Sequence, residues 1–405
     1  MLKLFNTLSR KKEEFQPLSD VVGIYTCGPS VYQYAHIGNF RTFVFEDVLV
    51  RYLRFRGFRV KRVMNLTDVE DKAIATARKE GKTLQELTEY YSRIFFEDME
   101  KLNLLPADVF PRATEHVPEI IGIIKKIVDN GYAYRGKDGT VYYDVSRFNR
   151  WGELSHLKLV PGKKKIKRDE WGEDSAIISD FALWKSYEKE DGNVFWETEL
   201  GKGRPGWHIE CSAMCTKHLG TRFDIHVGGV DNIFPHHETV MAQNFGAFGE
   251  NPSKYWLHTR HLMIDGRKMS KSMGNFYTLH DLLEKGYRPM VIKYLLLSMS
   301  YRRRLNFTFH GLEEAGENLE KIHCAIERIK RAKGVDDVEK IAMKALKKFE
   351  KVMNDNLDTG KALKIMEELS DAVIGMEPDK GSSRKILETF RTMDSILGLS
   401  LFKPF

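Results

Sequence analysis

The sequence predicts an α/β fold, in which a parallel sheet carries an insertion and is followed by an all-α helical bundle. Three observations predict this fold. Near the N-terminus a strand-like run, a turn, an amphipathic helix and a second strand-like run follow one another, which is the crossover order of a parallel sheet. Between about residues 96 and 200 the regular spacing of apolar residues becomes less clear, and strand and helix patterns return after residue 200. From residue 312 onward, apolar residues recur only at helical spacing.

The first strand and helix are expected to enclose a nucleotide-binding turn. Residues 21–27 are mostly β-branched and aromatic until Gly28 and Pro29 break the run. Apolar residues at three- and four-residue spacing over 43–53 predict a helix, so the tetrapeptide HIGN at 36–39 lies where that helix begins. A glycine and unpaired N–H groups let a polyanion approach closely, and an imidazole can donate to a phosphate oxygen. The alternative is a surface or capping role for the histidine.

Residues 59–65 form the second predicted strand, and residues 68–82 form a loop that enters a further helix. Strand, helix and strand in this order indicate a Rossmann-like parallel sheet. The sequence GKT at 81–83 resembles the end of a phosphate-binding loop. That motif also requires a glycine five positions earlier, where this chain has Thr76, so we exclude it.

Residues 96–200 are expected to form an insertion between the two halves of the nucleotide-binding sheet. Three prolines punctuate the first part, and we expect a helix over 117–130 and a hairpin over 133–145. The insertion also contains a basic run, KKKIKR, at 163–168. This run is either a solvated loop or a contact with nucleic-acid phosphates.

The second half of the sheet begins at 203–211, where a loop is expected to lead into a helix. Residues 224–227 are strand-like, and Pro235 then occupies the first position of a predicted helix whose opening turn is HHE. This is not the HExxH motif of zinc proteases, because position 241 is methionine. The sequence KMSKS at 268–272 is flanked by glycines, which is typical of a basic loop or of a solvated charged turn.

Four amphipathic stripes predict a bundle of four consecutive helices. The stripes are Leu319, Ile322, Ile326 and Ile329; Ala342, Leu346, Phe349 and Met353; Leu363, Met366 and Val373; and Ile386, Phe390, Met393 and Leu397. The chain is therefore expected to divide into a first half of the nucleotide-binding domain at 1–95, an inserted domain at 96–200, a second half with the KMSKS loop at 201–275, a linker at 276–311 and the bundle at 312–405.

Cys27, Cys211 and His236 are candidate metal ligands. Each follows a predicted strand or begins a predicted helix, so a parallel sheet would bring the three together at its carboxyl edge. Thiolate and imidazole ligands favour zinc, and three ligands would leave a fourth position open for a substrate. The alternative is that the cysteines are small buried apolar residues.

The composition limits the class of protein. With 64 basic and 57 acidic residues, the net charge of +7 permits a polyanionic partner without requiring one. Four cysteines spread over 405 residues argue against a disulfide framework and for reduced thiols. The first residues become charged before a signal-peptide core develops, and no run reaches the roughly 18 apolar residues of a membrane span. We therefore expect a cytoplasmic protein with no membrane partner.

Six motifs together resemble the cysteinyl-tRNA synthetase family, which belongs to the class I aminoacyl-tRNA synthetases. They occur in the order of that family, and weaker similarity continues into the predicted bundle. The motifs are YTCGP at 25–29, YAHIGN at 34–39, NLTD at 65–68 followed by EDK at 70–72, RPGWHIECSAM at 204–214, GGVDNIFPHHE at 228–238 and KMSKSMGN at 268–275.

The resemblance implies an enzyme that activates cysteine with ATP and passes it to the terminal adenosine of tRNA(Cys). It also implies magnesium with the ATP and one zinc ion per chain that binds the substrate thiolate, since a soft metal prefers sulfur to the hydroxyl of serine. Residues that match the family's sites are the zinc ligands Cys27, Cys211 and His236; Thr67 and Trp207 of the cysteine pocket; His36, Asn39, Lys268 and Lys271 of the ATP signatures, with Gly28 and Gly38; and Asp231 beside the adenosine.

The sequence departs from the family's pattern at two places. The family's fourth zinc ligand is a glutamate four residues after the first histidine of the pair, and this chain has Val240 there. His237, Glu238 or Cys215 would replace it, unless three ligands suffice or the zinc is lost. The family also continues past the bundle into a small anticodon-reading domain, whereas this sequence ends at Phe405. Recognition of tRNA is therefore expected to rest on its acceptor stem and on the bundle.

The expected chemistry is attack of the cysteine carboxylate on the α-phosphate of ATP, driven by positioning and charge neutralisation. Two alternatives remain. A ligase that joins activated cysteine to the amine of a small sugar-like molecule resembles this family and also lacks the anticodon domain. An inactive paralogue that only binds tRNA or a partner would account for Val240. The intact HIGN and KMSKS motifs favour the tRNA ligase.

Overall fold

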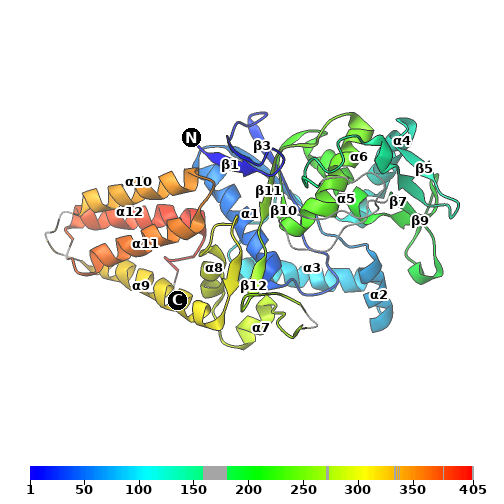
Figure 1. Cartoon of the computed structure of the whole chain (residues 1–405). Helices are drawn as coiled ribbons and strands as arrows, with labels where there is room; N and C mark the ends of the chain where they lie inside the picture. The colour runs from blue at the N-terminus through cyan, green and yellow to red at the C-terminus, as the bar shows by residue number, and fades with distance from the viewer. Residues whose placement is uncertain are drawn as a thin grey trace.

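The computed structural model describes residues 1–157, 180–270, 273–332, 334, 336, 338–376 and 378–403. Figure 1 shows three parts in a row, with a helical bundle at one end, a parallel sheet in the middle and a second sheet with its helices at the other end. The basic run at 163–168 and Lys271 lie outside the described residues.

The middle part is a four-stranded parallel sheet, which confirms the predicted fold class. Its strands, in spatial order, are β11 (Ser253–Thr259), β10 (Phe223–Gly229), β3 (Val21–Thr26) and β4 (Arg59–Met64). The chain winds from β3 to β4 in one direction and from β10 to β11 in the other. The carboxyl ends of β3 and β10 therefore flank a topological switch point, where open α/β sheets form their binding crevice.

Helix α1 (Ile37–Phe55) joins β3 to β4 and is buried on almost every side. It packs on the sheet and, away from it, against α8 (Pro289–Leu297) and α12 (Lys380–Leu397). A fully buried ion pair joins these helices, with Nζ of Lys293 3.1 Å from Oδ2 of Asp47. The lysine also donates to the carbonyl oxygen of Asn103 at 3.1 Å. Because buried charges are costly without partners, this pair fixes how α1 meets α8.

A second sheet is antiparallel, with five strands in the order β5-β6-β7-β9-β8, and all of them except β9 lie within the expected insertion at 96–200. Its strands are β5 (Ala133–Arg135), β6 (Val141–Tyr143), β7 (Phe181–Ser186), β8 (Trp196–Thr198) and β9 (Gly201–Pro205). The predicted hairpin is confirmed as β5 and β6. The expected loop at 203–205 is wrong, because these residues belong to β9. Gly203 makes this strand possible, since a Cβ there would lie 2.0 Å from the carbonyl oxygen of Lys185.

Three helices pack together beside this sheet: α4 (Val117–Asp129), α5 (Trp207–Leu219) and α6 (Glu238–Phe248). Helix α5 contacts β3 and β4 on one side and β7 on the other, so it links the two sheets. Two short turns, η4 (Val230–Asn232) and η5 (Ile233–His237), precede α6. Within η5 the backbone of Phe234 is extended, so the helical run starts at Pro235 as predicted.

Several small elements complete the part around the sheet. Strands β1 (Lys3–Asn6) and β2 (Lys11–Glu14) form a hairpin, and β12 (Leu262–Ile264), β13 (Arg267–Lys268) and β14 (Leu305–Phe307) form a three-stranded sheet. The helices are α2 (Asp71–Glu80), α3 (Leu84–Lys101) and α7 (Leu279–Glu284). The KMSKS motif therefore begins on a strand, because Lys268 pairs with Met263 of β12.

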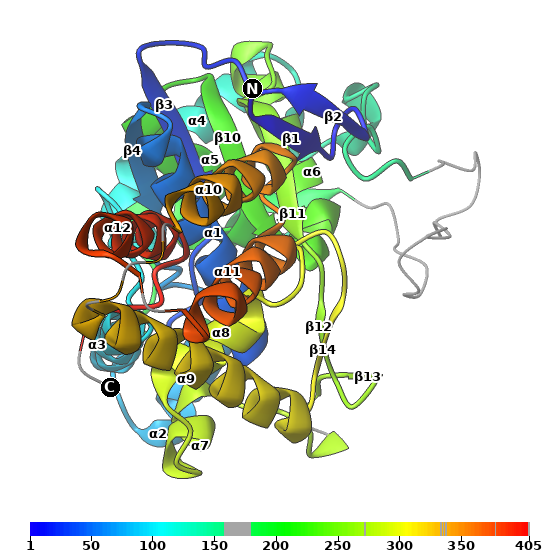
Figure 2. The same cartoon turned by 90° about the vertical axis from the view of Figure 1, so that its left-hand side faces the viewer.

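The C-terminal part is the predicted bundle, seen end-on in Figure 2. Its helices are α9 (Phe309–Arg331), α10 (Glu339–Asn354), α11 (Thr359–Ile374) and α12. The residues of the four predicted stripes are buried, apart from Leu346, which is half-buried. Within the described part of the chain, each helix is too short or too polar to cross a membrane.

Candidate functional site

A cavity of about 430 Å³ lies at the carboxyl ends of β3 and β10. Its walls come from the turn after β3, the start of α1, the start of α5, the end of β11 and the β12–β13 hairpin. Eight of the predicted site residues line it: Cys27, Gly28, His36, Gly38, Asn39, Trp207, Asp231 and Lys268. The topological switch point thus collects residues that are far apart in the sequence, as expected for this type of sheet.

Thr67 lies behind this cavity and does not appear among its lining residues. It is 4% exposed, and its Oγ1 accepts a hydrogen bond from Nδ2 of Asn65 at 3.0 Å. The side-chain oxygen of Asn65 in turn accepts from the backbone N–H of Gly28 at 3.0 Å. Thr67 therefore supports the turn after β3.

His36 and Asn39 form the N-terminal cap of α1. Nδ1 of His36 accepts from the backbone N–H of Asn39, and the Asn39 side-chain oxygen accepts from the backbone N–H of His36, both at 3.1 Å. This reciprocal pair satisfies two backbone donors at the helix start. Because Nδ1 acts as an acceptor, the neutral imidazole carries its proton on Nε2. The capping role and the nucleotide role are therefore compatible in one histidine.

The HIGN turn and the KMSKS motif face each other across very little space. A Cβ added to Gly38 would lie 3.0 Å from the ring of His36 and 3.2 Å from Cε of Met269. Lys268, the neighbour of Met269, lines the same cavity. Gly38 is thus the position at which the two motifs approach each other, and a larger residue would separate them.

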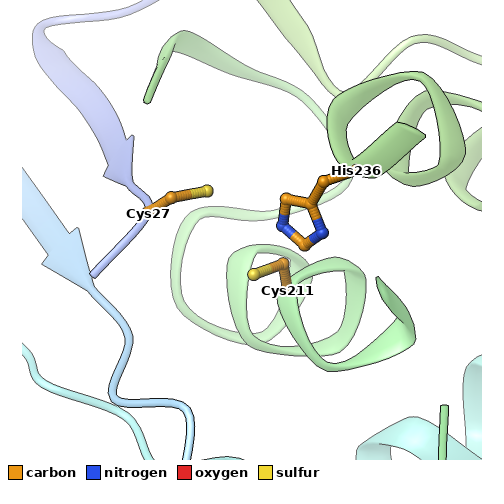
Figure 3. A group of neighbouring side chains, drawn as sticks. All are labelled: Cys27, Cys211 and His236. Carbon is orange, nitrogen blue, oxygen red and sulfur yellow. The ribbon is translucent and has the colours of Figure 1, made fainter. Parts of the chain in front are cut away.

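Cys27 lines this cavity, and its thiol lies close to Cys211 and His236, which are not among the lining residues. The ligand atoms of the three residues are all within 4.8 Å of one another (Figure 3). Cys27 follows β3, Cys211 lies in α5, and His236 lies in the turn before α6. Two thiols and one imidazole at this separation fit the donor preferences of zinc. The sequence-based grouping of these three residues agrees with where the structure places them.

The hydrogen bond between the Cys27 and Cys211 thiols moves their pKa values in opposite directions. The hydrogen bond from Cys27 holds the pKa of the Cys211 thiol well below its usual range, and the nearby His236 acts in the same direction, although burial opposes both. The pKa of Cys27 is raised by that same hydrogen bond and by burial. One thiolate therefore forms readily beside an imidazole, which is the state that a metal requires of its ligands.

The three residues that could replace the missing glutamate have different hydrogen-bond partners in the structure. The carboxylate of Glu238 accepts from the backbone N–H groups of Gly152 and Ser155 at 2.9 and 2.8 Å. The thiol of Cys215 donates to the carbonyl oxygen of Ser212. Nε2 of His237 lies 3.0 Å from Sγ of Cys27.

His237 also belongs to a second group of possible ligands. Its Nε2, a ring nitrogen of His226 and Sγ of Cys27 lie within 4.8 Å of one another. Of the three candidates for the missing donor, His237 is therefore the one that contacts a predicted metal ligand.

A chain of buried histidines supports this side of the site. Nδ1 of His237 lies 2.8 Å from Nε2 of His258, and Nδ1 of His258 lies 2.7 Å from Oγ1 of Thr7. On the other side, Nδ1 of His208 lies 2.9 Å from Nδ1 of His236. Burial lowers the pKa of His258 to about 3, and it also lowers the pKa values of His208 and His237. The imidazoles of His208, His237 and His258 are therefore neutral at pH 7.

Sequence reasoning did not single out several residues at the site. These are Tyr32, Tyr34, Lys72, Arg260 and His261 in the cavity wall, and Thr7, His208, His226 and His258 behind it. His208 and His226 lie inside the quoted motifs or beside them, so their motif context was a signal. Thr7 and His258 carried no such signal, because only tertiary contacts bring the first hairpin and β11 together.

The fold and this cavity define a class I aminoacyl-tRNA synthetase. The family model described as tRNA synthetases class I (C) catalytic domain matches residues 14–317. The solved structure of Mycobacterium tuberculosis methionyl-tRNA synthetase in complex with methionyl-adenylate shares the fold. Its TM-score is 0.64 at 13% sequence identity, over 94% of this chain and 90% of that one.

Curated relatives identify the family within this class. The cysteine–tRNA ligase of Chlamydia muridarum is 44% identical over 99% of this chain and 88% of its own length. The cysteine–tRNA ligase of Protochlamydia amoebophila is 42% identical over 99% of this chain and 86% of its own length. That of Brachyspira hyodysenteriae is 46% identical over 89% and 78%. The chain therefore belongs to the cysteinyl-tRNA synthetase family, as the motifs implied.

Proposed function

We propose that this chain is a cysteine–tRNA ligase, which activates L-cysteine with ATP and transfers it to the 3′ end of tRNA(Cys). The observation that carries the proposal is the cavity lined by Cys27, the HIGN turn and Lys268 of the KMSKS motif, with the ligand atoms of Cys211 and His236 within 4.8 Å of the Cys27 thiol. Activation of cysteine requires a sulfur-binding group next to a phosphate-binding turn. The curated relatives are named as tRNA ligases, which favours tRNA over a small amine as the acceptor.

In the activation step, the cysteine carboxylate attacks the α-phosphorus of ATP in line and the bond to pyrophosphate breaks. The Nε2–H of His36 donates to a phosphate oxygen, and Gly28 and Gly38 lie in the wall of the same cavity, Gly38 in the first turn of α1. Lys268 and Lys271 offset the charge that develops on the leaving pyrophosphate. Magnesium, bound with the ATP, neutralises phosphate charge.

Cys27, Cys211 and His236 would hold one zinc ion per chain. When bound, zinc supplies a position that takes a thiolate in preference to a hydroxyl, so the site separates cysteine from serine without relying on shape. His208 engages Nδ1 of His236, and we therefore assign Nε2 of His236 to the metal. The ring of Trp207 stacks on that of His236, with centroids 5.2 Å apart, and covers one side of the cysteine position.

In the transfer step, the terminal ribose hydroxyl of the tRNA attacks the carbonyl carbon of the adenylate and AMP leaves. We assign the halves at 1–95 and 201–275 to catalysis, with Asp231 beside the adenosine. The insertion at 96–200 would receive the acceptor end, the linker at 276–311 the stem, and the bundle at 312–405 the body of the tRNA. Such an enzyme acts in the cytoplasm, where its tRNA is charged.

Cysteine-dependent exchange of pyrophosphate into ATP tests the activation step, and charging of tRNA(Cys) tests the transfer. Wild-type protein is expected to do both, with cysteine preferred over serine. Lys268→Ala should slow the exchange about 100-fold or more with little change in cysteine affinity, because its charge acts on the leaving group. Lys285→Ala, a lysine just after α7, is the control and should leave the rate unchanged. Unaltered exchange in Lys268→Ala would refute the assigned role.

A further inference from the structure

Arg204 is a buried arginine between two carboxylates that belong to different parts of the molecule. It is 7% exposed. Its Nε donates to Oδ1 of Asp191 at 2.7 Å, within the insertion, and its second arm donates to Oδ1 of Asp71, the first residue of α2. Asp71 also accepts two hydrogen bonds from Nζ of Lys185 in β7, at 2.7 and 2.9 Å. The guanidinium therefore ties the inserted sheet to the start of α2.

The backbone on both sides of Arg204 is tightly packed against β7. A Cβ added to Gly203 or to Gly206 would lie 2.0 Å from a carbonyl oxygen of β7, so the backbone on both sides of Arg204 is pressed against that strand. Trp207 follows directly as the first residue of α5. Any shift of Arg204 along the strand is therefore passed on to Trp207.

Asp71 and Arg204 are each close in sequence to a residue that lines the catalytic cavity. Trp207, 44% exposed, lines the cavity and stacks on His236. Lys72, the neighbour of Asp71, lines the same cavity from α2. The two walls come from parts of the chain more than 130 residues apart, and Asp71 and Arg204 bridge them at a separation of 133 residues.

We propose that Arg204, acting through Asp71, is a positioning residue that sets the distance between the Trp207 wall and the Lys72 wall of the cysteine position. This inference rests on the proposed cysteine–tRNA ligase function. Arg204 lies outside the lining of the catalytic cavity, so its effect passes through its neighbours. Arginine suits the task better than lysine, because its planar fork binds two carboxylates at once in a fixed geometry.

The test compares steady-state constants for pyrophosphate exchange in Asp71→Asn, Asp71→Glu and Arg204→Lys. Asp71→Asn and Arg204→Lys are expected to raise KM for cysteine between about tenfold and 100-fold, because a shift of roughly 1 Å in a binding wall has effects of this size. KM for ATP should change less than about twofold, since the HIGN turn and Lys268 belong to α1 and to the β12–β13 hairpin and not to the two bridged walls. Asp71→Glu keeps the charge and should recover most of the cysteine affinity.

Arg78→Ala is the matched control. Arg78 lies in the same helix and also joins α2 to the insertion, through a hydrogen bond to the carbonyl oxygen of Glu190 at 2.9 Å. It is two turns farther from the cavity, so its loss should leave both KM values unchanged. Thermal midpoints of all variants show whether each is folded.

Equal losses for cysteine and ATP, or the same KM change in Arg78→Ala, would overturn the positioning role and leave only a structural one. Wild-type values in Asp71→Asn and Arg204→Lys would overturn it as well. These outcomes are separate from failure of the proposed function, because that failure is the absence of cysteine-dependent exchange in the wild-type protein.

Discussion

At the scale of single residues, the site depends on histidines that are kept neutral by burial. His258 is 3% exposed and hydrogen-bonds to both His237 and Thr7. A histidine with a lowered pKa in the folded protein binds fewer protons than the same residue in the unfolded chain. Its contribution to stability is therefore complete above the unfolded value near 6.5 and is lost as the pH falls toward the folded value.

The metal-free protein should consequently become less stable as the pH falls from 7 to 5. For His258, whose folded pKa is about 3, the loss approaches about 1.4 kcal/mol per pH unit below the unfolded value. Urea unfolding at several pH values, with a chelator present, measures the slope. His258→Gln should reduce it by about that amount.

His310→Gln serves as the control for this pH series, because the His310 side chain is 80% exposed on α9. It removes an imidazole from the surface rather than from the core, and should change the slope less than His258→Gln does. An identical slope in wild type and His258→Gln would show that His258 does not titrate in the way its burial requires.

At the scale of elements, the turn after β3 lies directly against the end of β4. The backbone N–H of Gly28 donates to the side chain of Asn65, and a Cβ at Gly28 would lie 1.8 Å from the Asn65 carbonyl oxygen. The glycine is required by this close approach, which places Cys27 and the phosphate turn beside each other.

Gly28→Ala should therefore cost about 1–3 kcal/mol of stability, in the range of overpacked cores, and slow cysteine-dependent exchange. Gly122→Ala is the matched change: it lies inside α4 with no atom within 4 Å of the added Cβ, and should gain up to about 1 kcal/mol. Chemical unfolding and pyrophosphate exchange measure both effects. A Gly28→Ala protein with wild-type stability and rate would mean that the turn tolerates displacement.

At the scale of the whole molecule, the catalytic helix and the bundle form one packed unit. Helix α1 starts at the HIGN turn and contains Asp47, which binds Lys293 of α8 and Arg51 of the same helix. Arg51 in turn donates to the carbonyl oxygen of Ser395 in α12. The orientation of the ATP turn is thereby coupled to the orientation of the bundle.

Local sequence patterns were sufficient to predict the parallel sheet, the first crossover helix and the four bundle helices. In each case one period of apolar residues runs without interruption, as in the stripe from Leu319 to Ile329. Local patterns did not predict three features: the hairpin β1–β2, the sheet β12–β14 and strand β9. The strands of these features have only two to five residues. Runs this short carry too little periodicity, and pairing with distant strands decides their conformation.

The candidate site, too, could be predicted from the sequence only in part. Motif spacing was enough to propose Cys27, Cys211 and His236 together, because the ends of parallel strands converge. It did not reveal that His237 faces Cys27 while Glu238 binds backbone N–H groups, since adjacent residues of a helical turn point in different directions. Nor did it reveal the Asp71–Arg204 bridge, which joins two segments with no shared pattern.

The most direct test of the central claim is the absorption spectrum of the protein loaded with cobalt in place of zinc, recorded with cysteine and then with serine. Binding at Cys27, Cys211 and His236 should give a thiolate-to-cobalt charge-transfer band that is weaker in Cys211→Ser. Cysteine should strengthen this band through its own thiolate, and serine should leave it unchanged. Equal responses to the two amino acids, or no thiolate band in the loaded wild-type protein, would contradict a metal that selects the substrate beside the ATP turn.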